Sequence, residues 1–165
     1  MTRAWGNCSS AVPWSLPPDW EHGMYQELTL SDADARLAIE IIRSETEKRG
    51  KSAVIAVADC RGELIGLLRM DGAAFSSVNV ATNKAFTAAR LRRPSSLIGK
   101  NAKNPETGFQ ISYYSDPRYI GFSGGLPVMV KGQTVGAIAV SGLTEAEDEE
   151  LAELAIKAIL AANPS

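Results

Sequence analysis

Apolar residues recur at helical spacing after residue 31, and this pattern predicts the first helix of the chain. Ser31 is a favourable N-cap because its hydroxyl can accept a hydrogen bond from a free N–H of the first turn. The acidic residues that follow suit the positive end of the helix dipole, and Gly50 supplies a stop after Arg49. The predicted helix therefore runs to Arg49, with an apolar face formed by Ala35, Ala38, Ile39 and Ile42.

Two pairs of short apolar stretches are separated by turn residues, and each pair predicts a β-hairpin. The first pair covers residues 52–59 and 63–70, and the second covers residues 126–130 and 134–140. Both connections contain a glycine, which suits a tight turn between antiparallel strands.

Further helices are expected between and after the hairpins. One covers residues 76–92, a short one begins at Pro94, and the last follows a capping box at residues 144–147 and extends through Leu160. The polar and aromatic stretch 101–116 is predicted to be a functional or interface loop. Small residues on the helix over 76–92 permit close approach of a neighbouring element; they are Ala81, Ala85, Ala88 and Ala89.

The order helix, hairpin, helices, hairpin, helix predicts an α/β (α+β) fold with a mainly antiparallel sheet flanked by helices. A doubly wound parallel nucleotide-binding fold is disfavoured. We expect one domain over residues 29–162, preceded by an irregular arm over residues 1–28. This arm holds all three tryptophans, which are expected to dock on the body or on a neighbouring subunit.

Composition narrows the classes of partner. The 17 Lys and Arg residues against 19 Asp and Glu residues give a net charge of -2, which offers no footprint for nucleic acid. No apolar run is long enough to span a membrane and the start lacks the layout of a secretory signal, so a cytoplasmic protein is expected. Two cysteines and one histidine predict no metal site, and no nucleotide or cofactor motif is found.

Several segments in fixed order carry a resemblance to a known family. They are Ala53–Asp59, Arg69–Ala73, Ala81–Ala88, Gly124–Val128 and Val135–Gly142. Together they resemble the GlcG/HbpS-like family, which includes the C-terminal domain of PduO-type proteins, over about residues 28–160. The resemblance implies a profilin-like fold, a homo-oligomer, and a pocket at or near subunit contacts. Members are associated with haem binding or degradation and with corrinoid metabolism, so the function must be argued from the site.

Lys84 is the first candidate for a functional residue. It stands beside small and apolar neighbours on its predicted helix, where a desolvated ammonium could hold a carboxylate or act as a base. The alternative is a structural lysine in a salt bridge. Gly124 and Gly125 could expose backbone N–H groups toward an anionic ligand, or they could simply form a turn before a strand.

Aromatic residues surround one arginine between residues 109 and 122. Rings for stacking and a guanidinium for a bidentate grip suit an aromatic carboxylate, whereas the same residue types are common in oligomer interfaces. Glu106 in the same region is a candidate acid or base, or a solvated side chain. The candidate substrate-binding residues here are Tyr114, Arg118, Tyr119 and Phe122.

Two functional hypotheses follow. The first is a homo-oligomeric small-molecule-binding protein; as an enzyme it would be a cofactor-independent lyase that uses Lys84 and Glu106 to eliminate ammonia or water from a substituted aromatic or carboxylated metabolite. The alternative is a haem-binding or haem-degrading protein that uses His22 or a tyrosine as the axial ligand.

Overall fold

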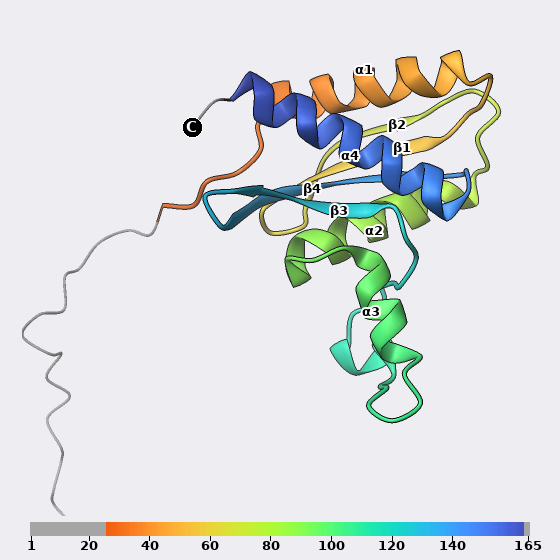
Figure 1. Cartoon of the computed structure of the whole chain (residues 1–165), viewed down its shortest axis with the longest axis vertical. Helices are drawn as coiled ribbons and strands as arrows, with labels where there is room; N and C mark the ends of the chain where they lie inside the picture. Colours follow the sequence, from red (N-terminus) through yellow and green to blue (C-terminus); the bar gives the residue numbers. More distant parts are fainter. Residues whose placement is uncertain (1–25, 164–165) are drawn as a thin grey trace, which may run out of the picture.

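A four-stranded antiparallel sheet with the strand order β2-β1-β4-β3 forms the centre of the computed structural model, which describes residues 26–163. The first hairpin supplies the inner strand β1 and the edge strand β2, and the second supplies the edge strand β3 and the inner strand β4 (Figure 1). The expected α+β fold with an antiparallel sheet is confirmed. The strands are β1 Val54–Asp59, β2 Leu64–Arg69, β3 Gly125–Val130 and β4 Gln133–Ser141.

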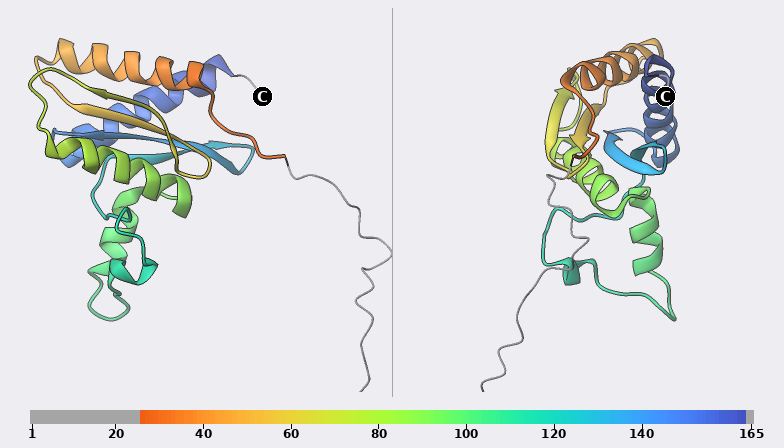
Figure 2. Two further views of the ribbon diagram at one scale, coloured as in Figure 1. Left: turned by 180° about the vertical axis from the view of Figure 1, so that it is seen from behind. Right: turned by 90° about the vertical axis from the view of Figure 1, so that its left-hand side faces the viewer.

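Helices cover both faces of this sheet. Helices α1 (Asp32–Lys48) and α4 (Glu145–Ala162) lie side by side on one face, and α2 (Ser76–Leu91) crosses the other face (Figure 1). The short helix α3 (Ser95–Ala102) and the 3₁₀ turn η1 (Ile111–Tyr114) extend away from the sheet as a protrusion below α2 (Figure 2).

The two long outer helices begin where the sequence predicts. Ser31 and Asp34 form a reciprocal capping box at α1, and Thr144 and Glu147 form the same arrangement at α4. The most visible difference concerns the predicted loop over 101–116, because α3 continues through Ala102 and η1 forms within the loop. Short helical turns of this kind give too few residues for a hydrophobic period to show.

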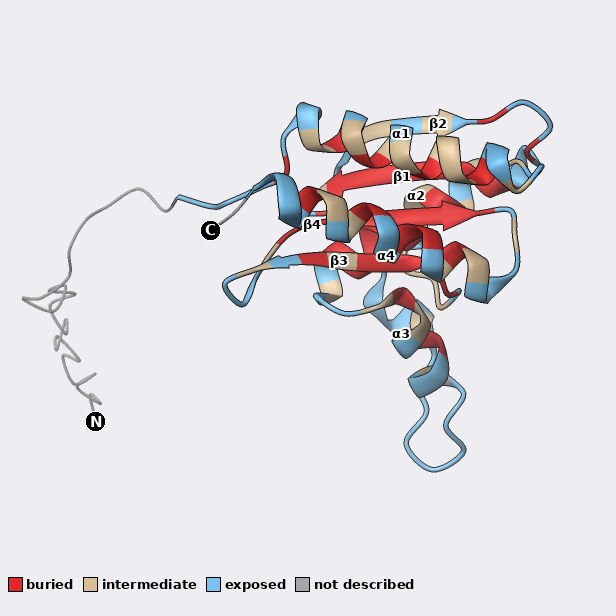
Figure 3. Cartoon of the chain, turned by 45° about the horizontal axis from the view of Figure 1, so that its top comes forward, coloured by how far each residue is buried: buried red, intermediate tan, exposed pale blue. Residues whose placement is uncertain are grey.

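The two faces of the sheet are packed differently. Residues of β1 alternate, so that Ile55 and Val57 face the helices α1 and α4 while Val54 and Ala56 face α2. The cluster toward α2 is built largely from alanines, including the predicted Ala81 and Ala85, which lets the helix axis approach the sheet closely. Figure 3 shows β1, β3 and β4 largely buried, the edge strand β2 partly exposed, and the protrusion largely exposed.

No helix within residues 26–163 combines the length and the hydropathy that crossing a membrane requires. The three tryptophans of the predicted arm and His22 lie outside the described residues.

Shortening Ile42 tests the packing between α1 and the sheet, because this side chain is fully buried. We expect Ile42→Ala to lower the free energy of unfolding by about 2–5 kcal/mol through lost burial and the cavity left behind. Denaturant unfolding monitored by circular dichroism measures the change. The control is Arg36→Ala on the exposed side of α1, which should change the free energy little; equal effects would contradict this packing.

Candidate functional site

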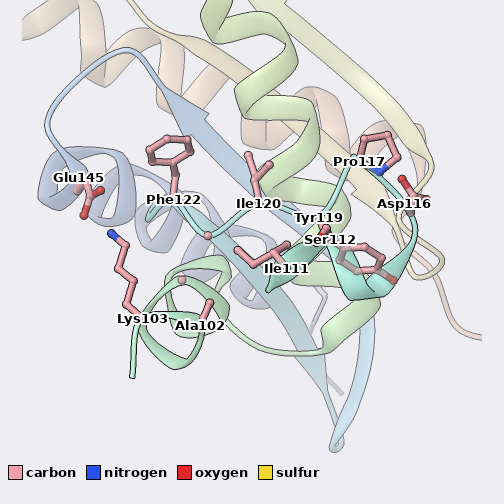
Figure 4. A pocket seen from close by; sticks show the side chains of 12 residues that line it. Ala102, Lys103, Ile111, Ser112, Asp116, Pro117, Tyr119, Ile120, Phe122 and Glu145 are labelled. Carbon is pink, nitrogen blue, oxygen red and sulfur yellow. The ribbon is translucent and has the colours of Figure 1, made fainter. Parts of the chain in front are cut away.

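A pocket of about 610 Å³ opens between α3, η1 and the segment that leads into β3. Its middle is apolar and is lined by Ile111, Ile120 and the ring of Phe122 (Figure 4). Tyr119 lines the part of the pocket nearer Asp116. The pocket therefore combines an apolar centre with polar groups toward its ends, which is the usual composition of a small-molecule site.

Two glycines bring the opposite walls of the pocket together at its base. A Cβ atom on Gly99 of α3 would lie 2.2 Å from the carbonyl oxygen of Gly121, and one on Gly121 would lie 2.4 Å from the Cα atom of Gly99. The backbones therefore touch in a way that no side chain permits. This contact sets how close α3 stands to the residues that precede β3.

Side chains of opposite charge face each other at one end of the pocket. The ammonium of Lys103, just after α3, points toward the carboxylate of Glu145, the first residue of α4 (Figure 4). Both side chains belong to exposed residues, so each can reorganise around a bound molecule. This end offers a cation for a ligand carboxylate and a carboxylate for a proton or an amine.

The aromatic cluster predicted around Arg118 is present, but its centre is Phe86 of α2. The guanidinium carbon of Arg118 lies 3.9 Å from the centroid of the Phe86 ring. The ring of Tyr119 packs edge-on against Phe86 at 5.1 Å, and Tyr114 packs on Tyr119 at 4.5 Å. The cluster thus joins α2, η1 and the segment before β3.

The guanidinium of Arg118 is engaged by carboxylates of the chain itself. It donates to both carboxylate oxygens of Asp116, the closer contact being 2.9 Å, and lies 3.5 Å from Glu63. These contacts raise the pKa of Arg118 and hold the pKa of Asp116 below its usual range. A ligand carboxylate would compete with Asp116 for this arginine.

Lys84 forms a buried ion pair with Asp148, a partner that sequence reasoning missed. Its ammonium donates to a carboxylate oxygen of Asp148 at 2.8 Å and to the carbonyl oxygen of Val140 at 2.8 Å, and both charged side chains are 4% exposed. Burial raises the pKa of Asp148, whereas hydrogen bonds from Lys84 and from the Leu143 N–H oppose that rise. The pair connects α2 with the first turn of α4, which lies on the other face of the sheet.

Gly124 and Gly125 lie against this ion pair. A Cβ atom on Gly124 would stand 2.6 Å from the Cβ of Asp148 and 3.1 Å from the Lys84 ammonium. One on Gly125 would stand 2.6 Å from the Lys84 carbonyl oxygen. Both glycines therefore make room for the lysine, and Gly124 also has φ +100°, a conformation that suits glycine.

Of the candidate residues from the sequence, Tyr119 and Phe122 line the pocket. Glu106 is exposed, and its N–H donates to the Asn104 side chain at 2.8 Å. The lining residues that sequence reasoning missed include Lys103, Ile120 and Glu145, which stand on connections or at a helix end, where no periodicity marks a functional position. The remaining candidates, which do not belong to the lining, are Lys84, Glu106, Tyr114, Arg118, Gly124 and Gly125.

The described range 26–163 contains no cluster of three or more histidine, cysteine or acidic side chains arranged to hold a metal ion.

Removing one partner of the buried ion pair should destabilise the protein strongly. We expect Lys84→Met and Asp148→Leu each to lower the free energy of unfolding by about 3–5 kcal/mol, because each leaves a buried charge without its counter-charge. The double variant Lys84→Met/Asp148→Leu should recover most of the loss, and denaturant unfolding of the four proteins gives the coupling. Lys157→Met serves as a control because its pair with Glu153 is exposed; additive single effects would argue against a coupled pair.

Comparison with known proteins shows which family this chain belongs to. A family model described as "Haem degrading protein HbpS-like" matches residues 30–157. Protein GlcG of Escherichia coli (strain K12) is 38% identical over 118 residues, which are 72% of this chain and 85% of GlcG.

Solved structures share the fold. Klebsiella pneumoniae protein ORFY superposes with a TM-score of 0.81 at 28% identity, covering 86% of this chain and 98% of ORFY. A PduOC:heme complex superposes with a TM-score of 0.73 at 21% identity, covering 79% of this chain and 95% of that one, which shows the fold alone. These matches confirm the resemblance carried by the sequence motifs, and the chain belongs to the HbpS-like family.

Proposed function

We propose that this protein binds haem in the pocket between α3, η1 and the segment before β3. The observation that carries the proposal is the pocket itself, whose apolar centre and the Lys103 ammonium at one end suit a flat, largely apolar molecule with carboxylates. The family is described as haem-degrading, and a structural neighbour was solved with heme. Both descriptions concern relatives and serve here as support.

The residues that line the pocket fit this ligand in three respects. The volume of about 610 Å³ falls within the range of cofactor sites, and Ile111, Ile120 and Phe122 offer apolar contacts to a macrocycle. Tyr119 carries a phenol, a group that ligates haem iron in some proteins. Lys103 can pair with a propionate at the exposed end.

Bound haem would supply the redox and oxygen chemistry of its iron, and the chain's own residues would hold and orient it. In this arrangement Tyr119 would hold the iron through its phenol oxygen, and the packing of its ring against Phe86 limits where that oxygen can point. His22 is outside the described residues and stays a predicted alternative ligand.

Titration with haemin tests the proposal. We expect a saturable shift of the Soret band for the wild type, a changed spectrum for Tyr119→Phe, and about tenfold weaker binding for Lys103→Ala, equivalent to one lost charge-assisted contact. Tyr113→Phe is the matched control, because Tyr113 is 74% exposed and does not line the pocket. His22→Ala distinguishes the alternative ligand. A wild type that gives no saturable Soret shift would contradict haem binding.

A second candidate is a cofactor-independent lyase that acts on a substituted aromatic or carboxylated metabolite. The observation that favours it is the approach of Lys103 and Glu145 at the pocket mouth, because an elimination needs one group to take a proton and another to give one. The catalytic roles of Lys84 and Glu106 stay predictions, and Lys84 would first have to leave Asp148. Release of ammonia from a substituted aromatic substrate, abolished in the Glu145→Gln variant, would support this candidate over haem binding.

We also propose that the chain forms a homo-oligomer. Its cytoplasmic location stays a prediction. Large apolar side chains are exposed on the described part of the chain, with Phe75 at 80% and Phe122 at 56%. We expect sedimentation equilibrium to give a multiple of the chain mass of 17.6 kDa. A single species at the mass of one chain would overturn self-association.

A further inference from the structure

Residues 119–122 form the inner wall of the pocket, and they belong to a wall segment, residues 118–123, that precedes strand β3 and is not part of the sheet. Backbone N–H and C=O groups that leave water need hydrogen-bond partners, and a strand in a sheet finds them in its neighbour. Within the described part of the chain, residues 118–123 pair with no strand; contact with β4 begins at Gly124, whose carbonyl oxygen accepts from the Val140 N–H at 3.0 Å. Two hydroxyl groups from helices supply partners instead.

Thr87 of α2 supplies the first hydroxyl. Thr87 is completely buried. Its Oγ1 donates to the carbonyl oxygen of Arg118 at 3.3 Å and accepts from the N–H of Ile120 at 3.0 Å. These two backbone groups flank Tyr119. The hydroxyl therefore fixes the backbone on both sides of the tyrosine that lines the pocket.

Ser95, the first residue of α3, supplies the second hydroxyl. It is also completely buried, and its Oγ donates to the carbonyl oxygen of Phe122 at 2.6 Å and accepts from the N–H of Gly125 at 3.1 Å. Ser95 thus connects α3 to the wall segment four residues before Gly99 meets Gly121. Helix α3 and the wall are joined at two points, and the pocket lies between them.

We propose that Thr87 and Ser95 are positioning residues, which hold the backbone of Tyr119 and Phe122 so that the pocket keeps its open shape. The proposal rests on the proposed function in taking this pocket as the binding site. Neither hydroxyl lines the pocket, so both act through the wall. Thr87 uses both its donor and its acceptor on the wall segment, and Ser95 joins that segment to Gly125, the first residue of β3. Two hydrogen bonds from one hydroxyl constrain the backbone more strongly than a single contact.

Amide hydrogen exchange tests the positioning without any ligand. We expect Thr87→Val to speed exchange of the Ile120 amide, and Ser95→Ala that of the Gly125 amide, each by about tenfold, the equivalent of one hydrogen bond. Thr87→Ser, which keeps the hydroxyl, should restore slow exchange.

The matched control is Thr46→Val. Thr46 is a completely buried threonine of α1 whose hydroxyl, among the described residues, bonds only to the carbonyl oxygen of Ile42 in its own helix. Unchanged exchange at Ile120 and Gly125 in the two test variants, or an equal change in Thr46→Val, would overturn the proposal.

Haemin affinity supplies the functional readout. We expect Thr87→Val and Ser95→Ala to weaken binding about tenfold, Thr87→Ser to recover it, and Thr46→Val to leave it unchanged at a comparable melting temperature. Binding that is equal in all variants would overturn the positioning role. If wild-type protein fails to bind haemin, the proposed function fails, and the exchange rates alone decide whether the two hydroxyls position the wall.

Discussion

The ion pair between Lys84 and Asp148 is the constraint on which the rest of this structure depends. The lysine starts on α2, passes the beginning of β3 and meets a carboxylate of α4 on the opposite face of the sheet. Two charges taken out of water require each other, so neither helix can shift alone without exposing one of them to an apolar environment. The pair thereby fixes the distance between the two helical layers.

The same ion pair restricts which residue types can occupy the adjoining positions of the chain. Only residues without a side chain fit beside the lysine, and Gly124 and Gly125 occupy that position at the entrance to β3. The wall of the pocket ends at these glycines, so a structural ion pair marks the boundary between the sheet and the candidate site. The lysine that the sequence singles out is thus next to the pocket wall, while its ammonium is directed to Asp148 rather than to the pocket.

The fold was largely predictable from the sequence because its signals are local. The capping boxes at Ser31 and Thr144 and the glycine-containing turns each act within a few residues. The site was less predictable because its contacts are distant in sequence. Lys84 and Asp148 are 64 residues apart, and Asp148 stands in an acidic stretch that resembles an ordinary solvated helix start. Phe86 shows how a large residue among alanines can be the centre of a cluster whose other members lie far along the chain.

The alanine-rich face between α2 and the sheet has a consequence for how this protein can diverge. On the other face, the core contains isoleucines and valines of different size, so a smaller side chain at one position can be offset by a larger one at a neighbouring position. At Ala81 and Ala85 the side chain is already a single methyl group, and every replacement except glycine adds volume where the helix touches the sheet. Substitutions should therefore accumulate in α1 and α4 but rarely on the inner side of α2. New ligand specificities would arise by changing the exposed protrusion.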